Sequence, residues 1–227
     1  MTTPAITGHG VFTPQLSISN EDLVAAFNAY ADRWNADHAG EIAAGEVAPL
    51  VHSSTEFIRS ASGIESRYVL DKEGILDPAR MCPRIPPRPD EVPGVMAEMA
   101  VDACAKALRM ADRTADDIDL VICAASNHER AYPAVAIEVQ DLLGCAGFAF
   151  DMNVACSSAT FGIQAAADMI RAGSVRRALV VNPEICSGHL EWRDRDCHFI
   201  FGDVCTAVLI EPSEEAMDAH WAIRSTR

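Results

Sequence analysis

The sequence predicts an α/β fold in which a mostly parallel or mixed five-stranded sheet is covered by helices on both faces. Short apolar runs alternate along the chain with longer segments that have helical periodicity. Runs such as Ile118–Ala124 and Arg176–Val181 lack polar alternation, which is typical of strands buried on both faces. The alternation of strands and helices indicates βαβ units, and therefore a sheet between two layers of helices.

Composition and charge exclude several functions. The 227 residues suffice for a sizeable core, and 49% hydrophobic with 22% charged residues is typical of a globular protein. The net charge of −15 argues against a nucleic-acid partner. No apolar run has membrane-spanning length, and the start at Met1 has no signal-peptide pattern. The eight cysteines have no paired spacing, so we expect free thiols in a reducing cytoplasm.

The first third of the chain contains strands and helices with clear end signals. A strand is expected at Ala5–Phe12, then a helix from Asn20 through Trp34 that Ser19 caps. Ser53–Gly63 is expected to be a short capped helix that ends at its glycine, and Ile64–Leu70 a strand.

Residues 77–94 contain six prolines and three arginines. Proline removes a backbone donor and fixes φ, so neither a regular helix nor a central strand is expected there. The insertion is either a surface excursion or a lid or dimer-contact loop, because long loops in compact domains are often functional.

From residue 95 onward, the expected strands and helices alternate more regularly than in the first third of the chain. Residues 126–133 follow a buried strand at its carboxyl end, where α/β sheets bind ligands. Helices are expected at Val95–Ala111, Ala134–Leu143 and Ser157–Ala172, a hairpin at Cys197–Phe201 and Val204–Glu211 with its turn at Gly202-Asp203, and a last strand at Ala219–Ser225.

Cys156 is the candidate nucleophile. It lies between the apolar run Gly147–Phe150 and the helix Ser157–Ala172, whose apolar residues cover nearly its whole circumference and predict burial. A thiol at a helix N-terminus is favoured as thiolate by the helix dipole, and the free N–H groups can stabilise an oxyanion. We therefore expect Cys156 to accept an acyl group and to react faster than the other thiols.

Residues around this cysteine carry a family resemblance. The segment Phe150–Gly173, together with Ala178–Asn182 and Phe201–Ala207, resembles the β-ketoacyl-acyl carrier protein synthase III enzymes of the thiolase superfamily. The matching segments follow the family's order from Pro4 onward. The resemblance implies a decarboxylative Claisen condensation of an acyl thioester with malonyl-acyl carrier protein, as in fatty acid biosynthesis.

The resemblance implies a catalytic role for Cys156. It also implies that Phe57, Arg59, Tyr132, Ser158 and Asp203 bind the substrate. The family usually has tryptophan at the position of Phe57 and arginine at that of Ala61, so this chain should hold coenzyme A less tightly. Arg59 either replaces that arginine or faces solvent. The weaker grip and the long proline-rich segment favour a medium-chain, β-ketodecanoyl-type donor.

Partners follow from the same resemblance. It implies a homodimer formed through the strand before Cys156 and the loop around Tyr132, with acyl-coenzyme A and malonyl-acyl carrier protein as substrates. No cofactor is expected, with acyl-coenzyme A only a substrate, and no metal. Cys186, His189, Cys197 and His198 match no zinc-binding spacing.

Family members have a second, similar half that supplies a histidine and an asparagine, and their motifs are absent here. We therefore assign residues 1–212 to an N-terminal thiolase-like domain and 213–227 to the start of a C-terminal half. Truncation is the favoured explanation, a second polypeptide the other. Two alternative functions stay open: another thiolase-superfamily acyltransferase, such as a secondary-metabolite or hydroxymethylglutaryl-type synthase, or a non-catalytic half-subunit.

Overall fold

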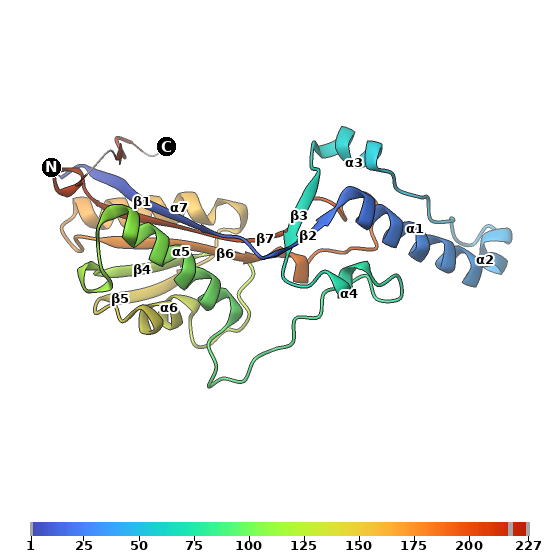
Figure 1. The fold of residues 1–227 in the computed structure, drawn as a ribbon, viewed down its shortest axis with the longest axis horizontal. Coiled ribbons are helices and arrows are strands. Elements are labelled where there is room, and N and C mark those ends of the chain that lie inside the picture. Colours follow the sequence, from blue (N-terminus) through green and yellow to red (C-terminus); the bar gives the residue numbers. More distant parts are fainter. Residues whose placement is uncertain (1, 218–219, 226–227) are drawn as a thin grey trace. The chain divides into compact units, whose positions relative to one another are not determined.

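The computed structural model describes residues 2–217 and 220–225 and divides the chain into two compact units. The first, here called the sheet unit, contains Met1–Thr13, Pro87–Glu184 and Val204–Arg227. The second, the insert unit, contains Pro14–Pro86 and Ile185–Asp203. Figure 1 shows the strands of the larger sheet and the helices α5, α6 and α7 in the sheet unit, and α1 to α4 in the insert unit.

The sheet unit is built on a six-stranded mixed sheet of order β5-β4-β6-β7-β1-β8. Strand β4 runs parallel to β5 and β6, whereas β1 runs antiparallel to β7 and β8. This confirms the mixed α/β fold, with one strand more than expected. The strands are β1 (Pro4–Phe12), β4 (Leu120–Ala124), β5 (Phe148–Met152), β6 (Ala178–Ile185), β7 (Asp203–Pro212) and β8 (Trp221–Ala222).

Helices cover both faces of this sheet (Figure 1). On one face lie α5 (Val95–Ala111), with its expected bounds, and α6 (Val135–Leu143), which ends at Gly144. A Cβ atom at Gly8 would lie 2.1 Å from the carbonyl oxygen of Ala107, and one at Gly10 2.0 Å from that of Ala103. Strand β1 therefore needs both glycines to approach the backbone of α5.

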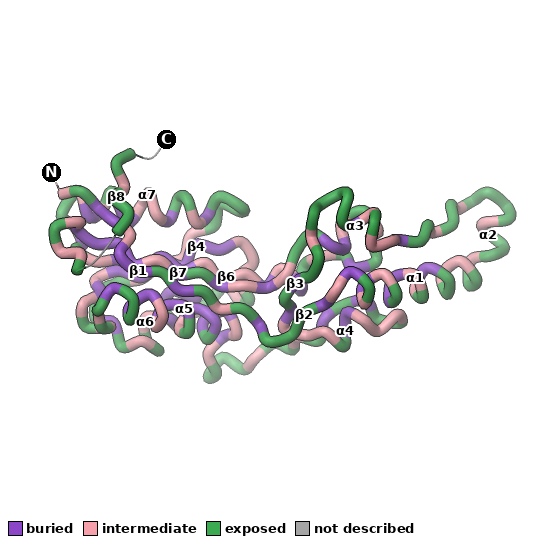
Figure 2. Tube along the Cα trace, turned by 45° about the horizontal axis from the view of Figure 1, so that its top comes forward, coloured by how far each residue is buried: buried purple, intermediate pink, exposed green. Residues whose placement is uncertain are grey.

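Helix α7 (Ser158–Arg171) packs on the other face, and only one of its sides is buried. Gly162, Ala166 and Ile170 face β4 and β6, whereas the Phe161 side chain is 52% exposed. Figure 2 shows this mixture of buried and exposed positions along α7. The expectation of a helix buried all round is wrong for the described residues, because apolar periodicity does not reveal how many neighbours a helix has.

The insert unit combines one long helix and several short ones with a two-stranded antiparallel sheet of β2 (Leu16–Ser19) and β3 (Ser66–Val69). The Ser19 hydroxyl accepts the Asp22 N–H at 3.0 Å and thereby caps α1, as the sequence predicts. Ser54 caps α3 in the same way through the Phe57 N–H, and α3 ends at Gly63 with φ of 73°. The helices are α1 (Asn20–Asp37), α2 (Ala39–Ala43), α3 (Thr55–Ser62) and α4 (Glu73–Leu76).

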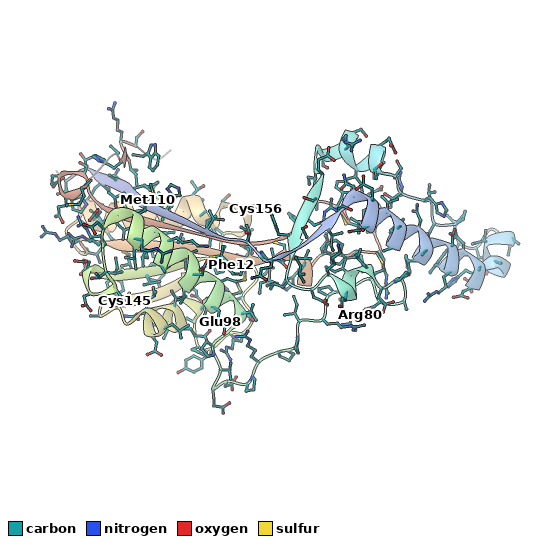
Figure 3. All side chains as sticks on the ribbon, viewed as in Figure 1. Phe12, Arg80, Glu98, Met110, Cys145 and Cys156 are labelled. Carbon is teal, nitrogen blue, oxygen red and sulfur yellow. The ribbon has the colours of Figure 1, made fainter. Side chains whose placement is uncertain are left out.

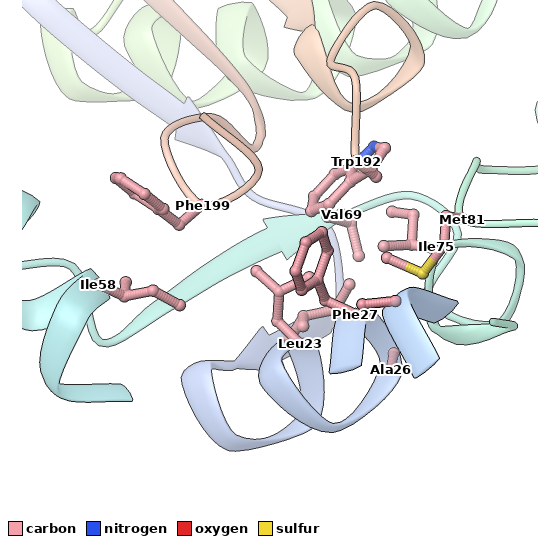
Figure 4. Packing of buried hydrophobic residues seen from close by; sticks show 11 residues of the cluster. Leu23, Ala26, Phe27, Ile58, Val69, Ile75, Met81, Trp192 and Phe199 are labelled. Carbon is pink, nitrogen blue, oxygen red and sulfur yellow. The ribbon is translucent and has the colours of Figure 1, made fainter. Parts of the chain in front are cut away.

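Large side chains fill the core of the insert unit. Figure 4 shows Leu23 and Phe27 of α1 directed towards Val69 and Trp192, with Ile75 and Met81 beside them. Trp192 is fully buried, and its Nε1–H donates to the Ser187 carbonyl at 2.9 Å. The indole thus anchors the otherwise irregular segment after β6.

The expected hairpin at residues 197–211 is only half present. Strand β7 forms, but residues 197–201 form turns, with the Cys197 and His198 N–H groups both donating to the Asp194 carbonyl. His198 and Phe199 are adjacent and both buried, so the two-residue alternation of a strand is lost. Burial of the His198 and Phe199 rings therefore determines the backbone conformation of these residues. Residue 219, the start of the expected last strand, lies outside the described residues, and β8 forms at Trp221–Ala222.

Residues 77–94 have no regular secondary structure, as expected. The segment passes from the insert unit to the sheet unit between Pro86 and Pro87. The domain boundary expected after residue 212 stays a prediction. Among the described residues, no helix combines the length and hydropathy needed to cross a membrane.

Candidate active site

Cys156 lies in a tight turn between the end of β5 at Met152 and the start of α7 at Ser158, as predicted. Figure 3 labels it near the start of α7, and its side chain is exposed. The preceding residue, Ala155, has φ of +49°, a left-handed conformation that costs an alanine on the order of 1–2 kcal/mol. Strain at this position is typical of functional turns.

Three hydrogen bonds made by two polar side chains, Asn153 and Ser158, hold this turn. The Asn153 side-chain oxygen accepts the Ala155 N–H at 3.0 Å. The Ser158 hydroxyl accepts the Val154 N–H at 2.9 Å and donates to the Ala155 carbonyl at 2.8 Å. Ser158 is 2% exposed, so these contacts favour a structural role. Its contact with a substrate stays a prediction. Ser157, at the N-cap position of α7, makes no capping bond with its side chain.

The cysteines differ in how far their thiols are exposed to solvent. Burial raises the pKa of Cys104 and Cys123 well above the usual value, and that of Cys205 to about 12. These thiols are poor nucleophiles, as their apolar surroundings predict. Cys82 in the insert unit is exposed like Cys156. Exposure alone therefore does not single out Cys156, and its place in the strained turn before α7 distinguishes it.

Polar contacts link the strand ends near this turn. The Glu184 carboxylate at the end of β6 accepts the Ser126 N–H and hydroxyl, both at 2.8 Å. The Asn153 amide donates to the Ser126 carbonyl at 3.0 Å, and the Asn182 amide donates to the Ala124 carbonyl at 2.6 Å. The carboxyl ends of β4, β5 and β6 are thus tied together, and they position the loop that follows β4.

That loop carries Tyr132, whose side chain is 86% exposed. The Glu129 carboxylate accepts the Val95 and Met96 N–H groups at 3.1 and 2.7 Å, and so caps α5. Arg130 pairs with Glu138 of α6. The loop is therefore anchored on both helices while the Tyr132 ring projects into solvent. This exposure is consistent with a partner contact, which stays a prediction.

In the insert unit, Phe57 is joined by an arginine that the sequence did not indicate. The Arg195 guanidinium lies 3.7 Å from the centroid of the Phe57 ring, and its Nε–H donates to the His52 carbonyl at 2.9 Å. Arg59 instead pairs with Glu65 on the surface, with Nε to Oε1 at 2.8 Å. Arg195, not Arg59, is thus the cation beside Phe57. No sequence pattern connects these distant positions.

Asp203 is buried and engaged within the insert unit. It accepts the Leu70 N–H at 2.8 Å, the Ser187 N–H at 2.8 Å and the Ser187 hydroxyl at 2.7 Å. Burial raises the pKa of this carboxyl, and the three donors partly offset the effect. These bonds favour a role in holding β3 and residues 185–188, while substrate binding by Asp203 stays a prediction.

Comparison with known proteins agrees with these features. Residues 150–225 match the model of the family 3-oxoacyl-[acyl-carrier-protein] synthase III. A β-ketodecanoyl-[acyl-carrier-protein] synthase of Pseudomonas aeruginosa is 56% identical over 203 residues, which cover 89% of this chain and 58% of the relative. A β-ketoacyl-[acyl-carrier-protein] synthase III of Granulibacter bethesdensis is 34% identical over 97% of this chain and 55% of the relative.

This chain is a relative of the synthase III enzymes. The crystal structure of 3-oxoacyl-[acyl-carrier-protein] synthase III from Aquifex aeolicus matches with a TM-score of 0.70 and 26% identity, over 93% of this chain and 54% of that one. The synthase III resemblance and the thiolase-like fold predicted from the sequence are thereby confirmed. The chain spans little more than half the length of these relatives.

Proposed function

We propose that this chain carries the acyl-accepting cysteine of a condensing enzyme that joins an acyl thioester to malonyl-acyl carrier protein in fatty acid biosynthesis. The observation that carries the proposal is the exposed Cys156 in a strained turn at the N-terminus of α7, within the segment that matches the family model. The thiolate attacks the thioester carbonyl, and the coenzyme A thiolate leaves. Positive potential at the start of α7 stabilises the oxyanion.

We further propose that the donor is a medium-chain acyl-coenzyme A. The relative with 56% identity is named for a β-ketodecanoyl product. In the insert unit, Phe57 and Arg195 offer a ring face and a cation to the nucleotide, a smaller surface than a tryptophan provides. Each buried methylene of the acyl chain adds about 0.8 kcal/mol, so six would contribute roughly 5 kcal/mol and offset a weaker grip on the head group.

Homodimerisation and a cytoplasmic location belong to the same proposal. Strand β5 is an edge of the sheet, and Phe148 on it is 49% exposed. An uncovered edge with apolar residues favours pairing with a second copy. Light scattering of the full-length protein at micromolar concentration should give the mass of a dimer, and a monomer would refute this part.

The test of the central proposal is intact mass spectrometry of the full-length protein. Incubation with octanoyl-coenzyme A should add one octanoyl group, far faster than acetyl-coenzyme A adds acetyl. The Cys156→Ser variant should gain no thioester. Addition of malonyl-acyl carrier protein to the acylated protein should release the β-ketoacyl product. Equal rates for the two donors would refute the medium-chain assignment, and acylation elsewhere would refute the role of Cys156.

A further inference from the structure

Three side chains on the α5 and α6 face of the sheet unit bring metal-binding atoms together. Cys123 of β4 lies opposite Asp151 of β5 in the parallel register. The thiol of Cys123, the carboxylate of Asp151 and an imidazole nitrogen of His128 all lie within 4.8 Å of one another. None of the three is needed for the proposed acyl transfer.

His128 supplies an independent indication of a ligand. Its Nε2 atom is buried, has no hydrogen-bond partner and lies 3.9 Å from Asp151 Oδ2. A buried polar atom without a partner costs about 1–3 kcal/mol, so a native structure is expected to satisfy it. The His128 and Asp151 side chains are 21% and 18% exposed, which leaves an approach from solvent.

Rigid neighbours hold all three donors. Cys123 is in a strand paired on both sides by β5 and β6. The Asp151 oxygens accept the Val135 and Ala136 N–H groups of α6 at 2.9 and 2.8 Å. His128 lies between Ser126 and Glu129, which are anchored to Glu184 and to the start of α5. Donors fixed in this way bind an ion with little loss of conformational freedom.

From this arrangement we propose that Cys123, His128 and Asp151 form a binding site for a divalent zinc ion. One thiolate and one imidazole favour zinc over calcium or magnesium, which prefer oxygen donors. Atoms bound to a tetrahedral zinc ion lie about 3.3–3.8 Å apart, given bond lengths of roughly 2.0–2.3 Å. The His128 Nε2–Asp151 Oδ2 distance of 3.9 Å lies just above this range, and the Cys123 thiol lies within 4.8 Å of a donor atom of each residue, so binding requires shifts of about 1 Å at most.

Binding balances charge and has a structural consequence. Cys123 releases its proton to solvent, so thiolate and carboxylate together neutralise the ion. A water molecule takes the fourth position. The ion then links residues 126–134, which carry Tyr132, to β4 and β5. The site therefore acts as a clamp on this loop and is separate from the acyl-accepting turn.

The test is a titration of the metal-free, full-length protein with Co²⁺ as a spectroscopic probe, followed by displacement with Zn²⁺. We expect one equivalent of Co²⁺ to give thiolate charge-transfer and tetrahedral d–d bands. Cys123→Ser should abolish the charge-transfer band, and His128→Gln should weaken binding at least tenfold. Asp151 is left unchanged because it caps α6, and His128→Gln alters only a loop, so its fold should persist by circular dichroism.

Matched controls separate this site from other thiols. Cys145→Ser removes another buried thiol and Cys156→Ser an exposed one, and both should bind Co²⁺ like the unmodified protein. Zinc should also slow proteolysis within residues 126–134 in the unmodified protein but not in His128→Gln. Absence of the bands in the unmodified protein, persistence of the charge-transfer band in Cys123→Ser, or unchanged affinity in His128→Gln would each overturn the proposal.

Discussion

Strand β4 of the sheet unit is buried along all five residues and carries no charge, whereas the core of the insert unit encloses His198, Arg67 and Asp203. Reactive or exposed groups of the sheet unit, such as Cys156 and Tyr132, lie in the segments that follow its strands. The insert unit buries more of its polar groups than the sheet unit, where Glu211 and Ser158 are also buried, and His198, Arg67 and Asp203 each have a protein partner. This difference predicts that changes near Cys156 affect chemistry with little effect on folding, whereas changes in the insert unit affect stability and its pH dependence.

The largest expected effect is on acyl transfer. Cys156→Ser in the full-length protein should reduce the rate of thioester formation at least about 10⁴-fold, because the nucleophile is removed. Since Cys156 is exposed, the free energy of unfolding should change by less than about 0.5 kcal/mol. Acylation assays quenched at set times measure the rate of thioester formation, and urea denaturation measures the free energy of unfolding. The control Cys82→Ser, at the other exposed thiol, should keep full activity. An equal loss of acylation rate in Cys82→Ser would contradict the assignment of Cys156 as the nucleophile.

The second effect concerns the core of the insert unit. Trp192→Ala should lower the free energy of unfolding by about 3–5 kcal/mol, because it leaves a large cavity and removes the bond to Ser187. Urea denaturation followed by circular dichroism measures the change. Trp221→Ala, at a 57% exposed position of the sheet unit, should cost less than about 0.5 kcal/mol. Similar costs for the two variants would show that burial of the indole does not stabilise the insert unit.

The third effect is a pH dependence within the insert unit. Burial and the nearby Arg67 and Arg195 lower the pKa of His198 from 6.5 to about 4. Between these values the unfolded chain binds a proton that the folded chain does not, so stability present above pH 6.5 is lost as the pH falls. From pH 7.5 to 4.5 this histidine should account for about 2–3 kcal/mol.

The measurement is the free energy of unfolding at both pH values for the unmodified protein and for His198→Gln, which lacks the titrating group. The variant should lose correspondingly less stability on acidification, so the difference between the two proteins isolates His198. His52→Gln, at an exposed histidine of the same unit, should behave like the unmodified protein. Parallel pH profiles for all three proteins would refute this assignment.

The smallest effect separates Arg195, which stacks on Phe57, from Arg59, which pairs with Glu65 at the surface. Arg195→Ala should raise KM for acyl-coenzyme A about tenfold and leave kcat nearly unchanged, because stacking of this kind contributes roughly 1–2 kcal/mol to ground-state binding. Arg59→Ala should change KM less than about twofold, since Glu65 already holds that guanidinium at the surface. Equal increases in steady-state KM for the two variants would show that both arginines contribute to binding of acyl-coenzyme A.

Regular elements were predictable because their signals are local. The periodicity of Met96, Met99 and Ala103 defined α5, and Gly144 ended α6. The turn carrying Cys156 was also predictable, because a strand pattern and a helix pattern meet there. The strain at Ala155 was not, since an alanine gives no indication of positive φ.

Contacts between distant positions could not be predicted from a single sequence. Nothing in the pattern joins Arg195 to Phe57, or His128 to the strand pair of Cys123 and Asp151. The prediction of a strand at residues 197–201 was wrong for the same reason. The turns there form around rings from α1 and α3, such as Phe27 and Phe57. Local propensity gave the wrong answer where tertiary packing determined the backbone.

The position of β1 in the sheet has a consequence for the order in which the chain folds during synthesis. Pro4 pairs with Pro212, and β1 lies between β7 and β8 although it is translated before both of them. The strand must therefore wait, unpaired, until nearly all of the described chain has been translated. Strands β4, β5 and β6 can assemble earlier with α6 and α7. Because non-local pairing is slow and leaves strand edges open to other chains, nascent molecules are most exposed to misassembly, and most in need of chaperones, during this interval.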